Sequence, residues 1–212
     1  MAAVTSGPIL NSMSAQPSYA RGETQPPLLE ETIGANLART VAAHPGGEAL
    51  VEVATGRRWT WAELDHDVDE VARGLLAAGL EKGDRVGIWA PNCAEWTLVQ
   101  YATARIGVVL AYAVEQSGRR MLLAASRFKT SDYAAMIEGI RPDQPRLERV
   151  VLVDTDDWAA LLAEGRSVAE GAVARRAATL DPDDPINIQY TSGTTRRPKG
   201  ATLSHRNILN NG

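Results

Sequence analysis

Cysteine is almost absent from this chain, since Cys93 is the only one among 212 residues. A single thiol excludes an internal disulfide framework and is typical of a protein in a reducing compartment. Cys93 could be a nucleophile, or a small residue near the start of a helix. The second interpretation is favoured, because none of the three histidines is a sequence neighbour and no cysteine-enzyme signature surrounds the thiol.

Long apolar runs are also missing. The longest, residues 108–114, is far shorter than the roughly 20 residues that span a membrane. Residues 1–28 lack the basic start and apolar core of a signal peptide, and their Ser, Gly, Pro and Gln content predicts a disordered tail. We therefore expect a cytoplasmic protein without a transmembrane segment, and peripheral attachment to a membrane stays open.

No excess of one charge sign points to a particular partner. The 26 acidic and 22 basic residues leave a net charge of −4. This slightly acidic net charge favours neither a nucleic acid nor an anionic membrane surface as a partner. With 212 residues, the chain is long enough to bury a substantial core.

From residue 28 onwards the chain alternates between helical and strand-like apolar patterns. Thr60 and Glu63 predict a capping box at the start of one helix, and Gly79 predicts its end. Such alternation is typical of an α/β fold with a largely parallel sheet flanked by helices. Helices are expected at 28–44, 60–79, 91–106, 131–139 and from Asp156 or Asp157 to 162, and strands at 50–53, 58–59, 85–90, 108–110, 121–125, 150–153 and 186–190.

Two acidic groups invite a metal or acid–base interpretation. The first is the polar face of the predicted helix 60–79, formed by Asp65, Asp67, Asp69 and Glu70. Such a face is usually just solvated, and we favour that interpretation. The second group, residues 154–157, lacks the spacing and distal glutamate of a calcium loop, so helix capping is favoured there. No metal ligand is assigned.

The most informative segment is residues 190–200, YTSGTTRRPKG, which lies between apolar stretches and is expected to join two strands. Its glycines let backbone N–H groups approach an anion, its hydroxyls donate to phosphate oxygens, and Lys199 adds positive charge. The segment is not a Walker loop, because its lysine precedes the glycine. An ordinary surface turn is the alternative interpretation of this composition.

The segment resembles the phosphate-binding loop of AMP-forming adenylating enzymes, which include acyl-CoA synthetases, luciferases and peptide-synthetase adenylation domains. Ten of its eleven positions are compatible with the family pattern, and residues 204–207 supply the Ser-His-x-Asn that follows it. The resemblance covers about residues 30–212, and residues 125–133 look most like fatty-acyl-CoA ligases. The other matching stretches are 59–64, 79–88 and 91–96.

This resemblance implies a fold and a reaction. Residues 29–212 would form a partial AMP-binding domain, the incomplete N-terminal part of the family's large α/β domain. In the family a carboxylate attacks the α-phosphate of ATP, pyrophosphate leaves, and the thiol of coenzyme A displaces AMP from the acyl-adenylate. The resemblance thus implies a fatty acid, ATP and coenzyme A as substrates, with Mg²⁺ as cofactor.

The resemblance also assigns site residues. Lys199 would place charge on the pyrophosphate side of ATP, and Gly200 would allow a tight exit into the next strand. His205 is interpreted as a helix-start residue. The residues expected to wrap the β- and γ-phosphates of MgATP are Thr191, Ser192, Gly193, Thr194 and Thr195.

Two local departures from the family pattern count against activity. Arg196 replaces a glycine, and a non-glycine residue costs about 1–2 kcal/mol if that position needs a positive φ. The opposite interpretation, in which Arg196 and Arg197 add charge for phosphate, is given less weight. Residues 111–120 also look too short for a parallel crossover with a helix, and we expect this loss to expose the sheet.

A third departure is that the sequence stops at Gly212, where a helix begins. The family's adenine, ribose and acyl sites, and the small C-terminal domain with its catalytic lysine, would follow this point. No catalytic residue is therefore assigned, since Lys199 belongs to the phosphate loop. The leading hypothesis is the N-terminal portion of a fatty-acyl-CoA ligase that does not complete the reaction alone. The alternatives are a non-catalytic nucleotide-binding module, which could pair with a separately encoded C-terminal portion, and an inactive remnant.

Overall fold

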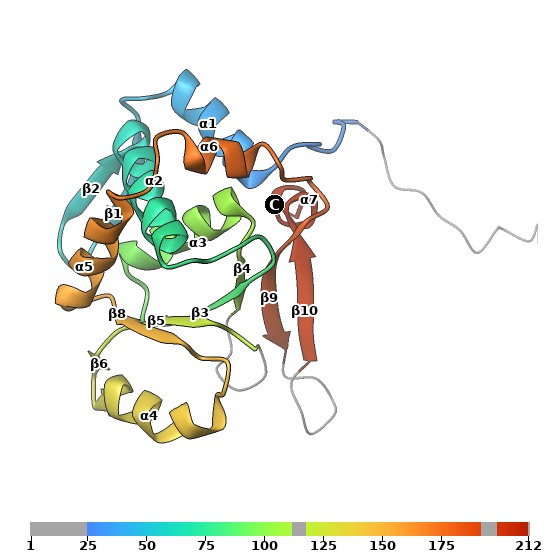
Figure 1. The fold of residues 1–212 in the computed structure, drawn as a ribbon. Coiled ribbons are helices and arrows are strands. Elements are labelled where there is room, and N and C mark those ends of the chain that lie inside the picture. The colour runs from blue at the N-terminus through green and yellow to red at the C-terminus, as the bar shows by residue number, and fades with distance from the viewer. Residues whose placement is uncertain (1–24, 112–117, 192–198, 212) are drawn as a thin grey trace, which may run out of the picture.

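A six-stranded, mainly parallel sheet organises the molecule (Figure 1). The computed structural model describes residues 25–111, 118–191 and 199–211. The strand order is β10-β9-β4-β3-β5-β8, and all neighbours are parallel except the antiparallel pair β9–β10. The α/β prediction is therefore confirmed. The strands are β3 (Arg85–Trp89), β4 (Val109–Ala111), β5 (Met121–Ala124), β8 (Arg149–Leu152), β9 (Pro185–Thr191) and β10 (Lys199–Ser204).

Helices cover both faces of this sheet unequally. Figure 1 shows most of them on one side, while α4 (Tyr133–Ile140) lies on the other. The helices on the more crowded side are α1 (Ile33–Ala43), α2 (Trp61–Ala77), α3 (Ala94–Ile106), α5 (Asp156–Gly165) and α6 (Ala172–Ala177). The remaining elements are the hairpins β1 (Glu48–Glu52) with β2 (Arg57–Thr60) and β6 (Arg127–Phe128) with β7 (Ser131–Asp132), the 3-10 turn η1 (Arg141–Asp143), and α7 (His205–Leu209).

Strand β5 shows how the sequence builds two cores. Successive side chains of a strand point to opposite faces. Met121 and Leu123 join the large core with α2 and α3, whereas Leu122 and Ala124 pack with Ile137 of α4. All four residues of β5 are buried, which explains why the strand reads as a continuous apolar run.

Local signals set most helix ends. The Thr60 hydroxyl accepts from the Glu63 amide, and the Glu63 carboxylate accepts from the Thr60 amide, so the predicted capping box is confirmed. The prediction for α5 is wrong in one respect: its N-cap is Thr155, not Asp156 or Asp157. Helix α1 begins at Ile33 rather than residue 28, because Thr32 caps it through the Ala35 amide.

The short connection between β4 and β5 does not expose the sheet. Both strands are parallel neighbours of β3, which lies between them, and every residue of both is buried. On β3, the Arg119 side chain covers Gly87, where an added Cβ would lie 2.6 Å from Arg119 Cδ. The expectation of an exposed sheet is therefore wrong for the described residues, since both strands are buried and Arg119 packs over Gly87.

Candidate functional site

The hairpin β9–β10 brings the two ends of the predicted phosphate loop together at the edge of the sheet. Thr191 lies opposite Lys199, and Tyr190 lies opposite Gly200. Thr191 and Lys199 are both exposed, so the mouth of the loop faces solvent. The expectation that the loop joins two strands is confirmed. Ser192, Gly193, Thr194, Thr195 and Arg196 lie outside the described residues.

Gly200 lies where a side chain would collide with the neighbouring strand. An added Cβ would lie 3.0 Å from Ile188 Cγ2 and 3.3 Å from the Tyr190 ring. The Tyr190 ring thus packs against the backbone of Gly200, and it can come this close because glycine has no side chain. The role expected of Gly200 in the exit from the loop stays a prediction.

Arg119 is a residue that sequence reasoning missed. Its side chain is 1% exposed and lies over Gly87 of β3. Burial lowers the pKa of the Arg119 guanidinium, and the electrostatic effect of Tyr190 opposes that shift. A fixed positive group therefore lies near the strand that enters the loop. Only the Arg119-Arg120 pair in the connection could have signalled it.

The base of the hairpin is closed by α7, which begins immediately after β10. Ser204 caps this helix: its hydroxyl accepts from the Asn207 amide, and Asn207 Oδ1 accepts from the Ser204 amide. His205 is the first residue of α7, as predicted, and is fully buried. Its Nδ1 accepts a hydrogen bond of 3.1 Å from the Ile33 amide.

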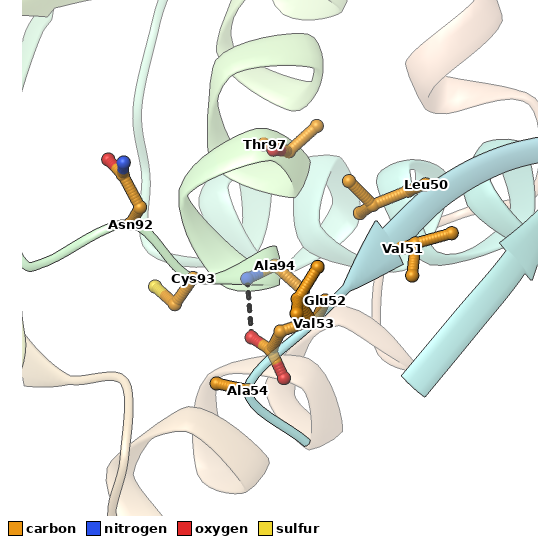
Figure 2. Close-up of a pocket in the computed structure, with 9 residues that line it drawn as sticks. All are labelled: Leu50, Val51, Glu52, Val53, Ala54, Asn92, Cys93, Ala94 and Thr97. Carbon is orange, nitrogen blue, oxygen red and sulfur yellow. Dashed lines mark hydrogen bonds between the residues drawn. The ribbon is translucent and has the colours of Figure 1, made fainter. Parts of the chain in front are cut away.

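Cys93 lies in a small cavity of about 340 Å³ between the end of β1 and the start of α3 (Figure 2). Cys93 is the N-cap residue of α3, and the capping bond comes instead from Glu52, whose carboxylate accepts from the Ala94 amide at 2.9 Å. Burial raises the pKa of the Cys93 thiol to about 11, so it is protonated at neutral pH. These observations favour the small residue near a helix start over the nucleophile.

Arg57 strengthens this tertiary cap. Its guanidinium pairs with Glu52 and Glu95, each at 2.9 Å. The hydrogen bonds from Arg57 and then Thr55 lower the pKa of Glu52 to about 2. The cavity is thus lined by an ion-paired carboxylate whose partners belong to the fold, and we assign it no ligand.

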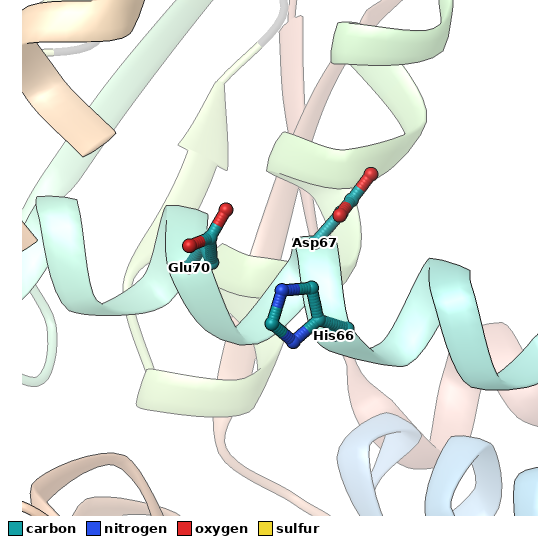
Figure 3. Close-up of side chains that lie close together, drawn as sticks. All are labelled: His66, Asp67 and Glu70. Carbon is teal, nitrogen blue, oxygen red and sulfur yellow. The ribbon is translucent and has the colours of Figure 1, made fainter. Parts of the chain in front are cut away.

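The acidic face of α2 is partly tied into the structure. Asp65 pairs with Arg105 of α3, and Asp67 accepts from the Trp59 indole at 2.8 Å, so a purely solvated face was too simple an expectation. His66, Asp67 and Glu70 hold possible ligand atoms within 4.8 Å of one another (Figure 3). Exposed groups of this kind are common without an ion, and no other observation marks a cation site here.

The 154–157 cluster has structural partners too. Asp154 accepts from the amide and hydroxyl of Ser126, and Asp157 accepts from the Leu152 amide. Thr155 caps α5. Capping and loop bracing therefore account for the cluster, in agreement with the interpretation favoured from its spacing.

Together, these features define an α/β domain that presents a Gly-, Ser- and Thr-rich hairpin loop at the edge of a mainly parallel sheet. The family model described as AMP-binding enzyme matches residues 37–212, and the chain belongs to this family.

Curated relatives place the chain near acyl-CoA ligases. It is 37% identical over 224 residues to the mitochondrial medium-chain acyl-CoA ligase ACSF2 of Danio rerio, and 38% identical over 226 residues to that of Homo sapiens. Both alignments cover 92% of this chain and 37% of the relative. The chain thus spans a little over a third of the length of these relatives.

Solved structures agree on the fold. The inhibitor-bound N-terminal domain of FACL13 from Mycobacterium tuberculosis has a TM-score of 0.69 and 28% identity, covering 82% of this chain and 44% of that one. A Mycobacterium tuberculosis fatty acyl CoA synthetase has a TM-score of 0.67 and 28% identity, covering 82% and 34%. Among the described residues, no helix is both long and apolar enough to cross a bilayer.

Proposed function

We propose that the β9–β10 hairpin binds the phosphates of MgATP and serves the AMP-forming activation of a fatty acid. The observation that carries this proposal is the pairing of Thr191 with Lys199, which sets a hydroxyl and an ammonium group at the exposed mouth of the loop, within an eleven-residue segment of the family composition. Compact positive charge and hydroxyl donors suit phosphate oxygens. Family membership supports the same assignment.

In this proposal the loop acts by position and charge. Thr191, with Ser192, Gly193, Thr194 and Thr195, would hold the β- and γ-phosphates, and Lys199 would offset the charge that grows on departing pyrophosphate. Gly200 would keep the strand after the loop close to Tyr190. Mg²⁺ would enter with ATP and neutralise phosphate charge. The residues at the mouth fit a phosphate rather than a resident metal, since Thr191 and Lys199 provide no carboxylate.

A fatty acid is the proposed acyl substrate, and coenzyme A the proposed acceptor. The curated relatives are named as medium-chain acyl-CoA ligases, and the solved relatives include a fatty acyl CoA synthetase. We propose the cytoplasm as the location, from the scarcity of cysteine.

The second candidate is a nucleotide-binding module that does not turn over by itself. It is favoured by Arg196 in place of the loop glycine. Such a module would either pair with a separately encoded C-terminal portion or be an inactive remnant.

The deciding experiment is thermal unfolding of the whole chain with and without MgATP, beside a Lys199→Ala variant. At about 100 times its dissociation constant, a ligand stabilises the fold by about 2.7 kcal/mol. We expect this shift in the reference chain and a much smaller one in the variant, with both unfolding alike without nucleotide because Lys199 is exposed. An ATP shift that Lys199→Ala leaves intact, or no shift in the reference chain, would overturn the proposed loop.

Adenylate formation separates the two candidates. ATP–pyrophosphate exchange that depends on a fatty acid would establish the ligase reaction in this chain. Binding of ATP without exchange would favour the module, and a C-terminal portion of a relative could then be added to test pairing.

A further inference from the structure

Residues 29–33, the segment that leads into α1, hold helix α7 by a set of contacts across the chain. The Leu29 amide donates to Asn210 Oδ1 at 2.8 Å, and Asn210 Nδ2 donates back to the Leu29 carbonyl at 3.1 Å. The Ile33 amide donates to Nδ1 of the buried His205 at 3.1 Å. Glu30 pairs with Arg206 between them. The two ends of the segment thus grip the two ends of α7.

An apolar contact lies behind these polar ones. Ile33 is buried with Ala104 of α3 and Ile186 of β9, and Ile208 and Leu209 of α7 pack against them. The segment, helix α7 and the start of strand β9 therefore share one small core. Burial of these apolar side chains adds a hydrophobic contribution to the hydrogen bonds that hold residues 29–33 against α7.

The same helix fixes both strands of the hairpin at their base. Strand β10 runs directly into α7 through Ser204, which lies opposite Pro185, the first residue of β9. Arg206 grips the turn before β9, since its amide donates to the Pro182 carbonyl at 2.9 Å and its guanidinium pairs with Asp183 at 2.7 Å. The position of α7 therefore sets where both strands begin their path to the loop.

We propose that residues 29–33 act as an N-terminal clasp that positions the β9–β10 hairpin, with His205 and Asn210 as its positioning residues. The clasp holds the end of the hairpin opposite to the loop, so that Lys199 and Thr191 face each other in one fixed register. The use of the hairpin for phosphate rests on the proposed function, but the hold of the clasp on the hairpin is measurable without nucleotide.

The clasp requires a neutral His205. Nδ1 accepts from Ile33, so the proton is on Nε2, which has no hydrogen-bond partner within the described parts of the chain. A second proton on Nδ1 would remove the acceptor and place an uncompensated charge in the core. The charged groups that act on the ring are Asp184, Lys82 and Asp181, and Asp184 is itself paired with Lys82 at 2.6 Å.

Amide hydrogen exchange of β10 tests the clasp directly. In His205→Leu the Ile33 amide loses its acceptor, and we expect exchange of the β10 amides to accelerate about tenfold, the effect of one lost buried hydrogen bond. Asn210→Ala, which removes partly exposed bonds, should accelerate it about threefold. His205→Asn keeps an acceptor near the Nδ1 position and should restore slow exchange. In the reference chain, but not in His205→Asn, exchange corrected for its intrinsic pH dependence should accelerate below pH 6.5.

Thr155→Ala is the matched control. It removes the cap of α5, far from the hairpin, and lowers overall stability by a comparable amount. It should therefore accelerate exchange in the central strand β5 and leave β10 unchanged. Unchanged β10 exchange in His205→Leu and Asn210→Ala would overturn the clasp, and so would equal acceleration by Thr155→Ala, because β10 would then open only with the whole fold.

The two proposals fail in different ways. A reference chain that does not respond to MgATP removes the proposed function and leaves the exchange result standing. A normal MgATP response together with β10 exchange that ignores His205→Leu removes the clasp alone.

Discussion

The central strands and the edge hairpin of the sheet differ in what holds them. Strand β5 is paired on both sides, and all its residues are buried between two layers of helices. Strand β10 is paired only with β9 among the described strands, and its first four residues are exposed. Strand β10 thus has less packing of its own than β5, and contacts at its base help to fix it.

The largest expected contrast is between a core and an edge truncation. Leu123→Ala removes a fully buried side chain from β5 and should lower the free energy of unfolding by about 2–5 kcal/mol. Thr202→Ala on the exposed part of β10 should change it by no more than about 0.5 kcal/mol. Urea unfolding of both variants gives the two values. Equal values would show that the edge is as tightly packed as the centre.

The same glycine-to-alanine change should also separate the two regions. At Gly74, where α2 crosses α5, an added Cβ would lie 2.7 Å from the Leu161 carbonyl oxygen, so the helices must move apart. We expect a loss of about 2 kcal/mol there, within the range for overpacked cores. At Gly200 the nearest atom is a side-chain methyl at 3.0 Å, so Gly200→Ala should cost about 1 kcal/mol or less.

Thermal unfolding of Gly74→Ala and Gly200→Ala measures the two losses of stability. Repeating the measurement with MgATP adds a second comparison, the stabilisation of each variant by nucleotide. The Gly74 variant should keep its nucleotide shift, whereas the Gly200 variant should lose part of it because the Tyr190 ring is displaced. The opposite pattern would mean that Gly200 has no part in shaping the loop.

Acid should weaken the hairpin base before the rest of the fold. Burial lowers the pKa of His205 to about 4, from 6.5 in an unfolded chain, and Asp184 opposes this shift. The unfolded state therefore takes up a proton first, so the contribution of His205 should lower stability as pH drops from about 6.5 to 4 and should stay constant below that. Urea unfolding across this range measures the slope, which His205→Asn should remove.

Glu52 provides an internal reference for that experiment. Its pKa is lowered to about 2 by Arg57 and Thr55, from 4.5, so its contribution is present above pH 4.5 and is lost only as pH falls towards 2. A loss of stability that begins below pH 4.5, with none between 6.5 and 4.5, would contradict the role of His205.

The smallest effect is expected at an exposed ion pair. Arg58 and Glu48 pair across the β1–β2 hairpin with side chains that are 64% and 55% exposed. Arg58→Ala should lower the free energy of unfolding by less than about 0.5 kcal/mol, and by less still at high salt, which screens exposed charges. A larger loss in urea unfolding would show that this outer hairpin, unlike β10, depends on its surface charges.

Local chemistry explains why much of the fold could be predicted. The capping box at Thr60, the helix end at Gly79 with its φ of 76°, and the two strands around the loop all depend on neighbours in sequence. The strand order does not follow from such local signals. Strands β4 and β5 are consecutive along the chain, but β3 lies between them in the sheet, and the sequence alone did not predict that order.

Some residues of the candidate site could likewise be predicted from the sequence, and others could not. Thr191, Lys199 and Gly200 could be found from a string of eleven residues, and the structure brings them together in one hairpin. Arg119 over Gly87 and His205 against Ile33 depend on contacts between distant segments, which no periodicity or spacing reveals. From the sequence, His205 could be predicted only as the start of a helix, because its hydrogen bond with Ile33 joins segments far apart in the chain.

The bond between Ile33 and His205 has a consequence for biosynthesis. The two residues are 172 positions apart, and a ribosome adds about 5–20 residues each second, so roughly 10–35 s pass between their syntheses. During that interval the amide at the start of α1 and the apolar side chain of Ile33 have no completed site to enter. The beginning of the domain is therefore among the last parts to settle, and it is the segment that we expect a chaperone to meet during translation.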